Sequence, residues 1–213
     1  MTDRHIEAVL WDFGGVILTS PFEAFNRYEA ERGLPTDLIR TVNTNNPDDN
    51  AWAKLERNDI GPAEFDDLFA AESEALGHRV PGADVLALLS GAVRPEMETA
   101  LDQVIAAGYK TACLTNNVVS DDTATQRRPD VANVMGKFGH VVESSKVGVR
   151  KPEPRFYEIA CELVEAAPEA CVFLDDLGIN LKPAKAMGMT TIKVVSAEQA
   201  IADLESVLGI ALR

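Results

Sequence analysis

The sequence has 213 residues, of which 46% are hydrophobic and 25% charged, with a formal net charge of −14. This length suits one large α/β domain, or a core domain with a small insert. A surface this acidic repels nucleic acid and anionic lipid, and no apolar stretch approaches the roughly 18 residues that a membrane span needs. The composition therefore predicts a soluble protein that binds neither nucleic acid nor membranes.

Short apolar runs that end in polar residues predict the strands of a parallel sheet. Three strong runs and two weaker ones lie at residues 8–11, 111–114 and 170–174, and at residues 140–142 and 191–195. Helical patterns separate them at residues 97–107, 154–165 and 181–187. Alternation of strand and helix predicts an α/β fold, a doubly wound parallel sheet with helices on both faces.

The segment from residue 20 to residue 90 has a different pattern, without a convincing strand. Aromatic residues at helical spacing mark its first part, and Trp52, Leu55 and Ile60 mark its middle. Four prolines divide it into short helices. We predict an inserted helical cap at residues 20–90 and a core domain at residues 1–19 and 91–213. The alternative is that these helices pack directly on the sheet.

The three cysteines, Cys113, Cys161 and Cys171, are odd in number, widely spaced and set in apolar runs. No pair has the spacing of metal ligands. They are expected to be buried, reduced thiols of a cytoplasmic protein. Charged residues precede the first apolar run, which favours a first strand over a signal peptide.

Four loops each place a polar element after or between the predicted strands. These elements are Asp12, the pair Thr115 and Asn116, Lys151, and the pair Asp175 and Asp176. Ligands of parallel sheets bind at the carboxyl ends of the strands. A phosphoryl-transfer site needs a carboxylate nucleophile, hydroxyl and amide donors, a cation, and carboxylates that hold Mg²⁺. Each element alone is typical of a turn or helix cap, but their combination predicts such a site.

Four segments resemble, in order, the motifs of the haloacid dehalogenase-like hydrolase family: WDFGGVI at 11–17, LTNN at 114–117, KPEPRFY at 151–157 and FLDDLGINLKPA at 173–184. The last segment, together with WAKLER at 52–57, is most similar to the phosphatase-like N-terminal domain of soluble epoxide hydrolases. The resemblance implies a Rossmann-like core with a cap and a magnesium-dependent phosphatase that acts on a small phosphorylated metabolite.

The resemblance also implies a role for each matched residue. Asp12 would attack phosphorus and form an aspartyl-phosphate, and Lys151 would neutralise charge on Asp12 and the phosphate. Thr115 and Asn116 would bind the transferring group. The Mg²⁺ ligands would be Asp12, the backbone carbonyl of Gly14 and Asp176, with Asp175 as a further or supporting ligand and Asn180 orienting that pair.

The sequence departs from the family pattern at Gly14, where most phosphatases of the family have an acid/base aspartate. Loss of a general acid typically costs on the order of 10²–10⁴ in rate, and Glu56 of the predicted cap is a possible substitute. Three alternatives stay open. They are a metal-free haloacid dehalogenase, a carbon–phosphorus hydrolase that uses Lys54, and a non-catalytic member that binds a phosphorylated ligand or a protein.

Overall fold

The computed structural model describes residues 5–89, 91–117 and 128–213. Its sheet has five parallel strands in the order β3-β2-β1-β4-β5. In chain order the strands are β1 (Ala8–Trp11), β2 (Lys110–Thr115), β3 (His140–Glu143), β4 (Cys171–Asp175) and β5 (Thr190–Lys193). The predicted doubly wound parallel sheet is confirmed; β1 has the predicted bounds, and the bounds of the other strands differ from the predicted ones by at most two residues.

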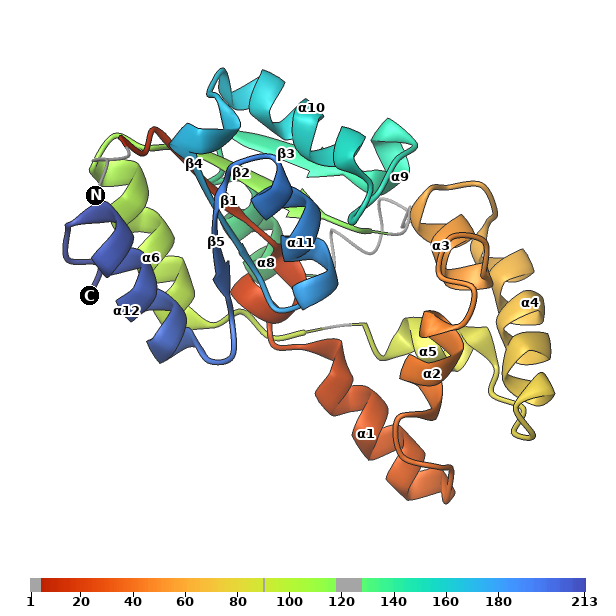
Figure 1. Ribbon diagram of the computed structural model, residues 1–213. Helices are drawn as coiled ribbons and strands as arrows, with labels where there is room; N and C mark the ends of the chain where they lie inside the picture. The colour runs from red at the N-terminus through yellow and green to blue at the C-terminus, as the bar shows by residue number, and fades with distance from the viewer. Residues whose placement is uncertain (1–4, 90, 118–127) are drawn as a thin grey trace.

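Helices cover both faces of this sheet (Figure 1). They are α6 (Pro95–Ala106), α8 (Pro129–Met135), α9 (Ser144–Val147), α10 (Pro154–Val164), α11 (Gly178–Ala186) and α12 (Ala197–Leu208). The predictions did not include α8, α9 and α12. The sequence does carry a signal for α12, because Ser196 and Gln199 form a capping box at its start.

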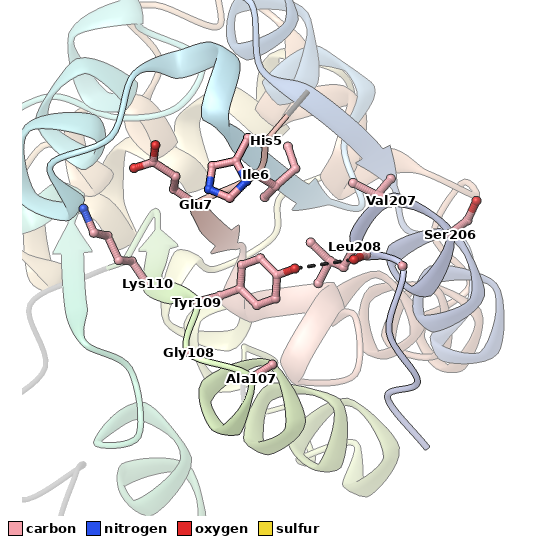
Figure 2. Close-up of a pocket in the computed structure, with 11 residues that line it drawn as sticks. His5, Ile6, Glu7, Ala107, Gly108, Tyr109, Lys110, Ser206, Val207 and Leu208 are labelled. Carbon is pink, nitrogen blue, oxygen red and sulfur yellow. Dashed lines mark hydrogen bonds between the residues drawn. The ribbon is translucent and has the colours of Figure 1, made fainter. Parts of the chain in front are cut away.

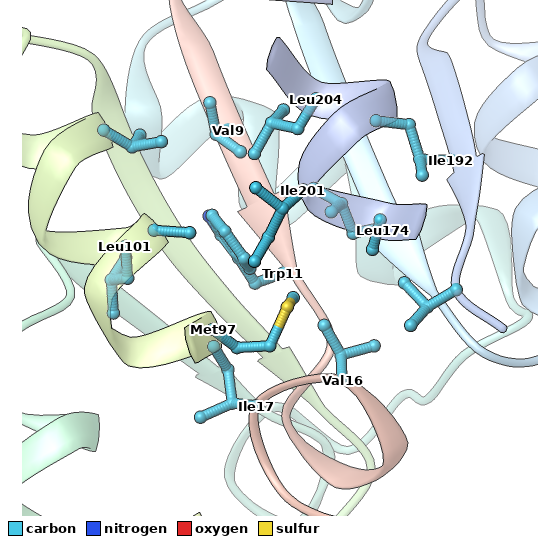
Figure 3. Packing of buried hydrophobic residues seen from close by; sticks show 14 of the residues in the cluster. Val9, Trp11, Val16, Ile17, Met97, Leu101, Leu174, Ile192, Ile201 and Leu204 are labelled. Atoms are coloured by element: carbon cyan, nitrogen blue, oxygen red, sulfur yellow. The ribbon is translucent and has the colours of Figure 1, made fainter. Parts of the chain in front are cut away.

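Alternate residues of each strand face opposite layers, which explains the continuous apolar runs. On one face Val9 and Trp11 pack against Met97 and Leu101 of α6 and against α12 (Figure 3). On the other face Leu10 packs in a cluster with α10 and α11. The central strands β1, β2 and β4 are therefore buried on both sides, and only their ends are available for chemistry. All three cysteines are buried and none forms a disulfide.

Residues 21–87 form five helices that lie to one side of the sheet layers (Figure 1). They are α1 (Pro21–Arg32), α2 (Leu38–Thr44), α3 (Ala51–Glu56), α4 (Pro62–Ala75) and α5 (Gly82–Ala87). Buried side chains of these helices, including Phe25, Ile39, Phe65 and Phe69, make a hydrophobic cluster of their own. The prolines separate the helices as predicted.

The predicted helical pattern includes Trp52, Leu55 and Ile60, but the observed helix does not reach Ile60. Helix α3 ends at Glu56, because Asn58 has a left-handed backbone with φ of 63°. Two chain segments connect the helices to the sheet layers and run antiparallel, with a bridge between Leu18 and Val93. Residue 90, where the predicted insert ends, lies outside the described residues. Among the described residues, none of the helices has the length and apolar character of a membrane span.

Candidate active site

The sheet order places β1 between β2 and β4, so their carboxyl ends meet at one edge. Asp12 follows β1, Thr115 ends β2 and Asp175 ends β4. The amide of Asp12 donates to the Leu174 carbonyl at 2.8 Å, which continues the β1–β4 ladder as far as Asp12. The topology therefore brings Asp12 together with residues that are more than a hundred positions further along the sequence.

Lys151 lies at the centre of this group. Its side chain is 2% exposed, and its ammonium Nζ is 2.7 Å from Asp12 Oδ1 and 2.9 Å from Asp175 Oδ2. Burial alone would lower the pKa of Lys151, but the neighbouring carboxylates raise it above its ordinary value. Lys151 is therefore a charged ammonium held between two carboxylates.

Asp12, Asp175 and Asp176 each have a carboxylate oxygen within 4.8 Å of the others. Burial raises the pKa of Asp12 well above its usual range, against the attraction of Lys151, and Asp175 and Asp176 add to the rise. Burial, together with repulsion from Asp175, raises the pKa of Asp176 to about 6. Three carboxylates around one ammonium leave an excess of negative charge, and oxygen ligands of this kind suit a hard divalent cation such as Mg²⁺.

The two neighbouring carboxylates at the end of β4, Asp175 and Asp176, differ in their surroundings. Asp175 is fully buried, and its oxygens accept hydrogen bonds from Lys151, from the Leu177 amide at 2.7 Å and from Asn180 Nδ2 at 3.0 Å. The Tyr157 hydroxyl donates to the Asn180 carbonyl at 2.7 Å and so holds that residue in place. Asp176 is only partly buried, and Ser20 Oγ at 3.4 Å is its one side-chain donor within the described chain.

The turn after Asp12 contains two glycines with different constraints. Gly14 has φ of −74°, and a Cβ added there would meet nothing within 4 Å. Gly15 has φ of 81°, and a Cβ added there would lie 2.2 Å from Asp176 Oδ2. Gly15 is thus required for the approach of Asp176, whereas Gly14 could carry a side chain. The sequence prediction singled out Gly14 and missed Gly15, although the Gly-Gly pair was a signal.

Thr115 and Asn116 lie beside this group but are bonded differently. Thr115 is buried, and its hydroxyl makes no hydrogen bond within the described part of the chain. The Asn116 side chain is occupied, since Nδ2 donates to the Lys151 carbonyl at 2.9 Å and Oδ1 accepts from the Lys151 amide at 2.9 Å. Of these two side chains, only that of Thr115 is free to bind a ligand.

Two residues near the site were not predicted. Arg150 Nη1 is 2.7 Å from Glu56 Oε2, so that α3 is joined to the residue before Lys151. Ser20 contacts Asp176 and also caps α1. No local pattern identifies either contact, because the partners are 94 and 156 positions apart.

A cavity of about 910 Å³ lies at the opposite end of the sheet, near the amino ends of β1 and β2 (Figure 2). Its lining includes His5, Glu7, Lys110 and Tyr109, whose hydroxyl donates to the Leu208 carbonyl at 3.4 Å. It contains none of the predicted site residues. We place the candidate site at the carboxyl ends of the strands, where the charged groups converge.

The chain is similar in amino-acid sequence to curated proteins that have several different names. It is 32% identical over 214 residues to mouse acyl-CoA dehydrogenase family member 10, and the aligned region covers 98% of this chain and 20% of the relative. It is 30% identical to mouse bifunctional epoxide hydrolase 2, over 96% of this chain and 39% of the relative. The chain thus spans well under half of these two proteins. A sesquiterpene phosphatase from Aspergillus oryzae is 24% identical, with 95% of this chain and 97% of the relative covered.

Solved structures share the fold at low sequence identity. A haloacid dehalogenase family enzyme from Bacteroides thetaiotaomicron, in complex with magnesium and inorganic phosphate, has a TM-score of 0.62 at 21% identity, covering 93% of this chain and 98% of that one. L-2-haloacid dehalogenase from Xanthobacter autotrophicus, with chloropropionic acid covalently bound, also has a TM-score of 0.62, at 19% identity, covering 98% and 84% of the two chains. The same fold therefore accompanies both metal-bound and dehalogenase members.

The family model of the haloacid dehalogenase-like hydrolases matches residues 6–188. That range includes the whole candidate site and helices α1–α5. By sequence and by fold, the chain is a member of the haloacid dehalogenase-like hydrolase family.

Proposed function

We propose that the protein is a Mg²⁺-dependent phosphatase that acts on a small phosphorylated metabolite through Asp12. The observation that carries the proposal is the unbalanced charge of the site, in which one buried ammonium faces three carboxylates. A divalent cation would balance this charge, and a phosphate ester would bring the oxygens that the cation and Lys151 stabilise. A metal-free dehalogenase has no use for such an excess of carboxylates.

Asp12 is the proposed nucleophile. One oxygen, Oδ1, contacts Lys151 and accepts from the Phe13 amide at 2.6 Å, while Oδ2 accepts no hydrogen bond within the described residues. We propose that Asp12 attacks phosphorus as the bond from phosphorus to the leaving oxygen breaks. Water then attacks the phosphorus of the aspartyl-phosphate, which releases inorganic phosphate and restores the Asp12 carboxylate.

Asp12, Asp176 and the Gly14 carbonyl are the proposed Mg²⁺ ligands, and the ion would neutralise charge on the phosphate oxygens. Asp175 is proposed to orient Lys151 instead, because hydrogen bonds already occupy both of its oxygens. Thr115 would bind the phosphoryl group through its hydroxyl, and Asn116 through its backbone amide, since the Asn116 side chain is held by Lys151.

No carboxyl group stands at position 14 to protonate the leaving group, so a leaving group that needs little protonation would react best. We further propose that residues 20–90 form the cap over a core of residues 1–19 and 91–213, and that the protein is cytoplasmic, in keeping with its three free thiols. The separate hydrophobic cluster of α1–α5 supports this division.

A screen of phosphorylated metabolites with and without Mg²⁺ tests the proposal, with Asp12→Asn as the control. Turnover that requires both Mg²⁺ and Asp12 is the expected result. Release of halide from 2-haloacids without metal would favour a dehalogenase. A well-folded protein that turns over neither class of compound would be a non-catalytic member of the family.

A further inference from the structure

An ion pair between α3 and the loop that carries Lys151 is almost completely buried. Arg150 Nη1 lies 2.7 Å from Glu56 Oε2, and the two side chains are 11% and 8% exposed. The guanidinium also donates through Nη2 to the carbonyl of Pro47, just before α3. Arg150 therefore holds both α3 and the chain that leads into it.

Hydrogen bonds connect this ion pair to the candidate nucleophile. Asn116 Nδ2 donates to Glu56 Oε2 at 3.2 Å and to the Lys151 carbonyl at 2.9 Å, and the Lys151 amide donates back to Asn116 Oδ1 at 2.9 Å. The Lys151 ammonium then contacts Asp12 at 2.7 Å. Only Asn116 separates the Glu56 carboxylate from the backbone of Lys151.

Glu56 is poorly placed to act as the missing acid. Its Oε2 already accepts hydrogen bonds from Arg150 and from Asn116. Burial raises the pKa of Glu56, and the charge of Arg150 opposes that rise. A carboxylate that is held by two neighbours orients those neighbours more readily than it exchanges protons with a substrate.

Stability alone does not account for this arrangement, because apolar residues of similar size are often at least as stabilising as a buried ion pair. What a buried, fully bonded pair does provide is one defined geometry between two parts of a chain. Here those parts are α3 and the loop of Lys151.

We propose that Glu56 is a positioning residue for the proposed phosphatase reaction, on which this inference rests. Docked against Arg150 and Asn116, it fixes the Lys151 backbone so that the ammonium stays on Asp12. The position of α3 on the core thereby affects the geometry between Lys151 and Asp12. A small displacement of a catalytic group costs up to about 10² in rate.

The test compares Glu56→Gln, Arg150→Met and Arg150→Lys with wild type, using p-nitrophenyl phosphate and Mg²⁺. We expect Glu56→Gln and Arg150→Met to lower kcat by about 10-fold to 10²-fold with KM changed less than about 3-fold. Arg150→Lys, which keeps the charge, should recover part of the loss. The matched control is Asp59→Asn, because Asp59 pairs with Arg57 at 2.9 Å within the helical segment and is half exposed. It should leave kcat unchanged.

A purely structural role would lower the melting temperature and leave kcat per folded molecule intact, and that result would overturn the proposal. So would a kcat for Glu56→Gln within about 2-fold of wild type.

Acrylamide quenching of tryptophan fluorescence tests the docking of α3 without any activity. The sequence has two tryptophans; Trp11 is fully buried in the core, whereas Trp52 lies in α3 one turn before Glu56. Quenching should increase in Glu56→Gln and Arg150→Met but not in Asp59→Asn. Unchanged quenching in the first two would refute the docking. If wild-type protein hydrolyses no phosphate ester, the proposed function fails and the positioning role fails with it, while quenching still decides whether Glu56 docks α3.

Discussion

The carboxylate site and the Glu56–Arg150 contact are both buried and charged, but their charges are balanced differently. At the contact, one carboxylate meets one guanidinium at 2.7 Å. At the site, the Lys151 ammonium contacts Asp12 and Asp175, and the carboxylate of Asp176 lies within 4.8 Å of theirs. The charges of the ion pair neutralise each other, whereas the excess negative charge of the site is neutralised only when a cation binds. We therefore propose that the chemistry takes place at the carboxylates and that the Glu56–Arg150 contact has a positioning role.

Replacing Asp12, the proposed nucleophile, should have the largest effect. Asp12→Asn keeps the shape of the side chain but cannot form an aspartyl-phosphate, so we expect kcat to fall by roughly 10⁴-fold or more. Because burial already opposes the charge on Asp12, the melting temperature should change by only a few degrees. Phosphatase assays and calorimetry on the same preparation measure both. Substantial residual activity would contradict the covalent mechanism, and unfolding would assign Asp12 a structural role.

Lys151→Met removes the ammonium that contacts Asp12 and Asp175. Without the ammonium, Asp12 and Asp175 lose their buried partner, which typically costs about 3–5 kcal/mol of stability. We also expect kcat/KM to fall by about 10²–10³. Binding of fluoroberyllate, a phosphate analogue, should weaken in parallel. Wild-type affinity for this analogue in Lys151→Met would remove Lys151 from the phosphate site.

Adding a carboxylate at position 14 should increase activity on poor leaving groups. The backbone of Gly14 is ordinary, with φ of −74°, and the space around a new Cβ is open, so Gly14→Asp should fold without strain. We expect up to about 10² more activity on alkyl phosphates and little change on aryl or acyl phosphates, which need no proton. Gly14→Ala is the control and should gain nothing. No gain in a stable, Mg²⁺-binding Gly14→Asp protein would mean that the acid comes from elsewhere.

We expect the smallest effect from Gly15→Ala, which should weaken Mg²⁺ binding at the proposed metal site. Its Cβ would lie 2.2 Å from Asp176 Oδ2, so Asp176 must move, and we expect the Mg²⁺ affinity to fall about 10-fold. Gly77→Ala is the matched control, because Gly77 also has a positive φ, of 91°, but nothing within 4 Å of the added Cβ. Both variants should lose about 1 kcal/mol of stability from the backbone. Titration calorimetry with Mg²⁺ should separate them, and equal affinities would contradict a role for Asp176.

Much of the sheet was predictable, since a strand buried on both faces needs a continuous apolar run and a polar residue where it ends. That logic identified β1, β2 and β4 and the residues that follow them. The edge strands β3 and β5, with partly exposed residues, gave weaker signals. Helix α12 was missed although its capping box is visible in the sequence.

The members of the candidate site were predictable, and so were the contact of Lys151 with Asp12 and that of Asn180 with Asp175. Asp12, Lys151 and Asp175 could be named because each ends or follows a strand or lies in a family motif. That Lys151 also contacts Asp175 depends on distances that only the fold sets. The Glu56–Arg150 pair could not be predicted for the same reason, because it joins α3 to a loop 94 residues further along the chain.

Trapping of the covalent intermediate tests the central claim most directly. The protein is mixed with Mg²⁺ and a reactive acyl phosphate, quenched in acid within one turnover, and its peptides are analysed by mass spectrometry. We expect one phosphoryl group on the peptide that contains Asp12, dependent on Mg²⁺ and absent from Asp12→Asn. Turnover without a phosphorylated Asp12 peptide, or a phosphoryl group that persists in Asp12→Asn, would contradict it.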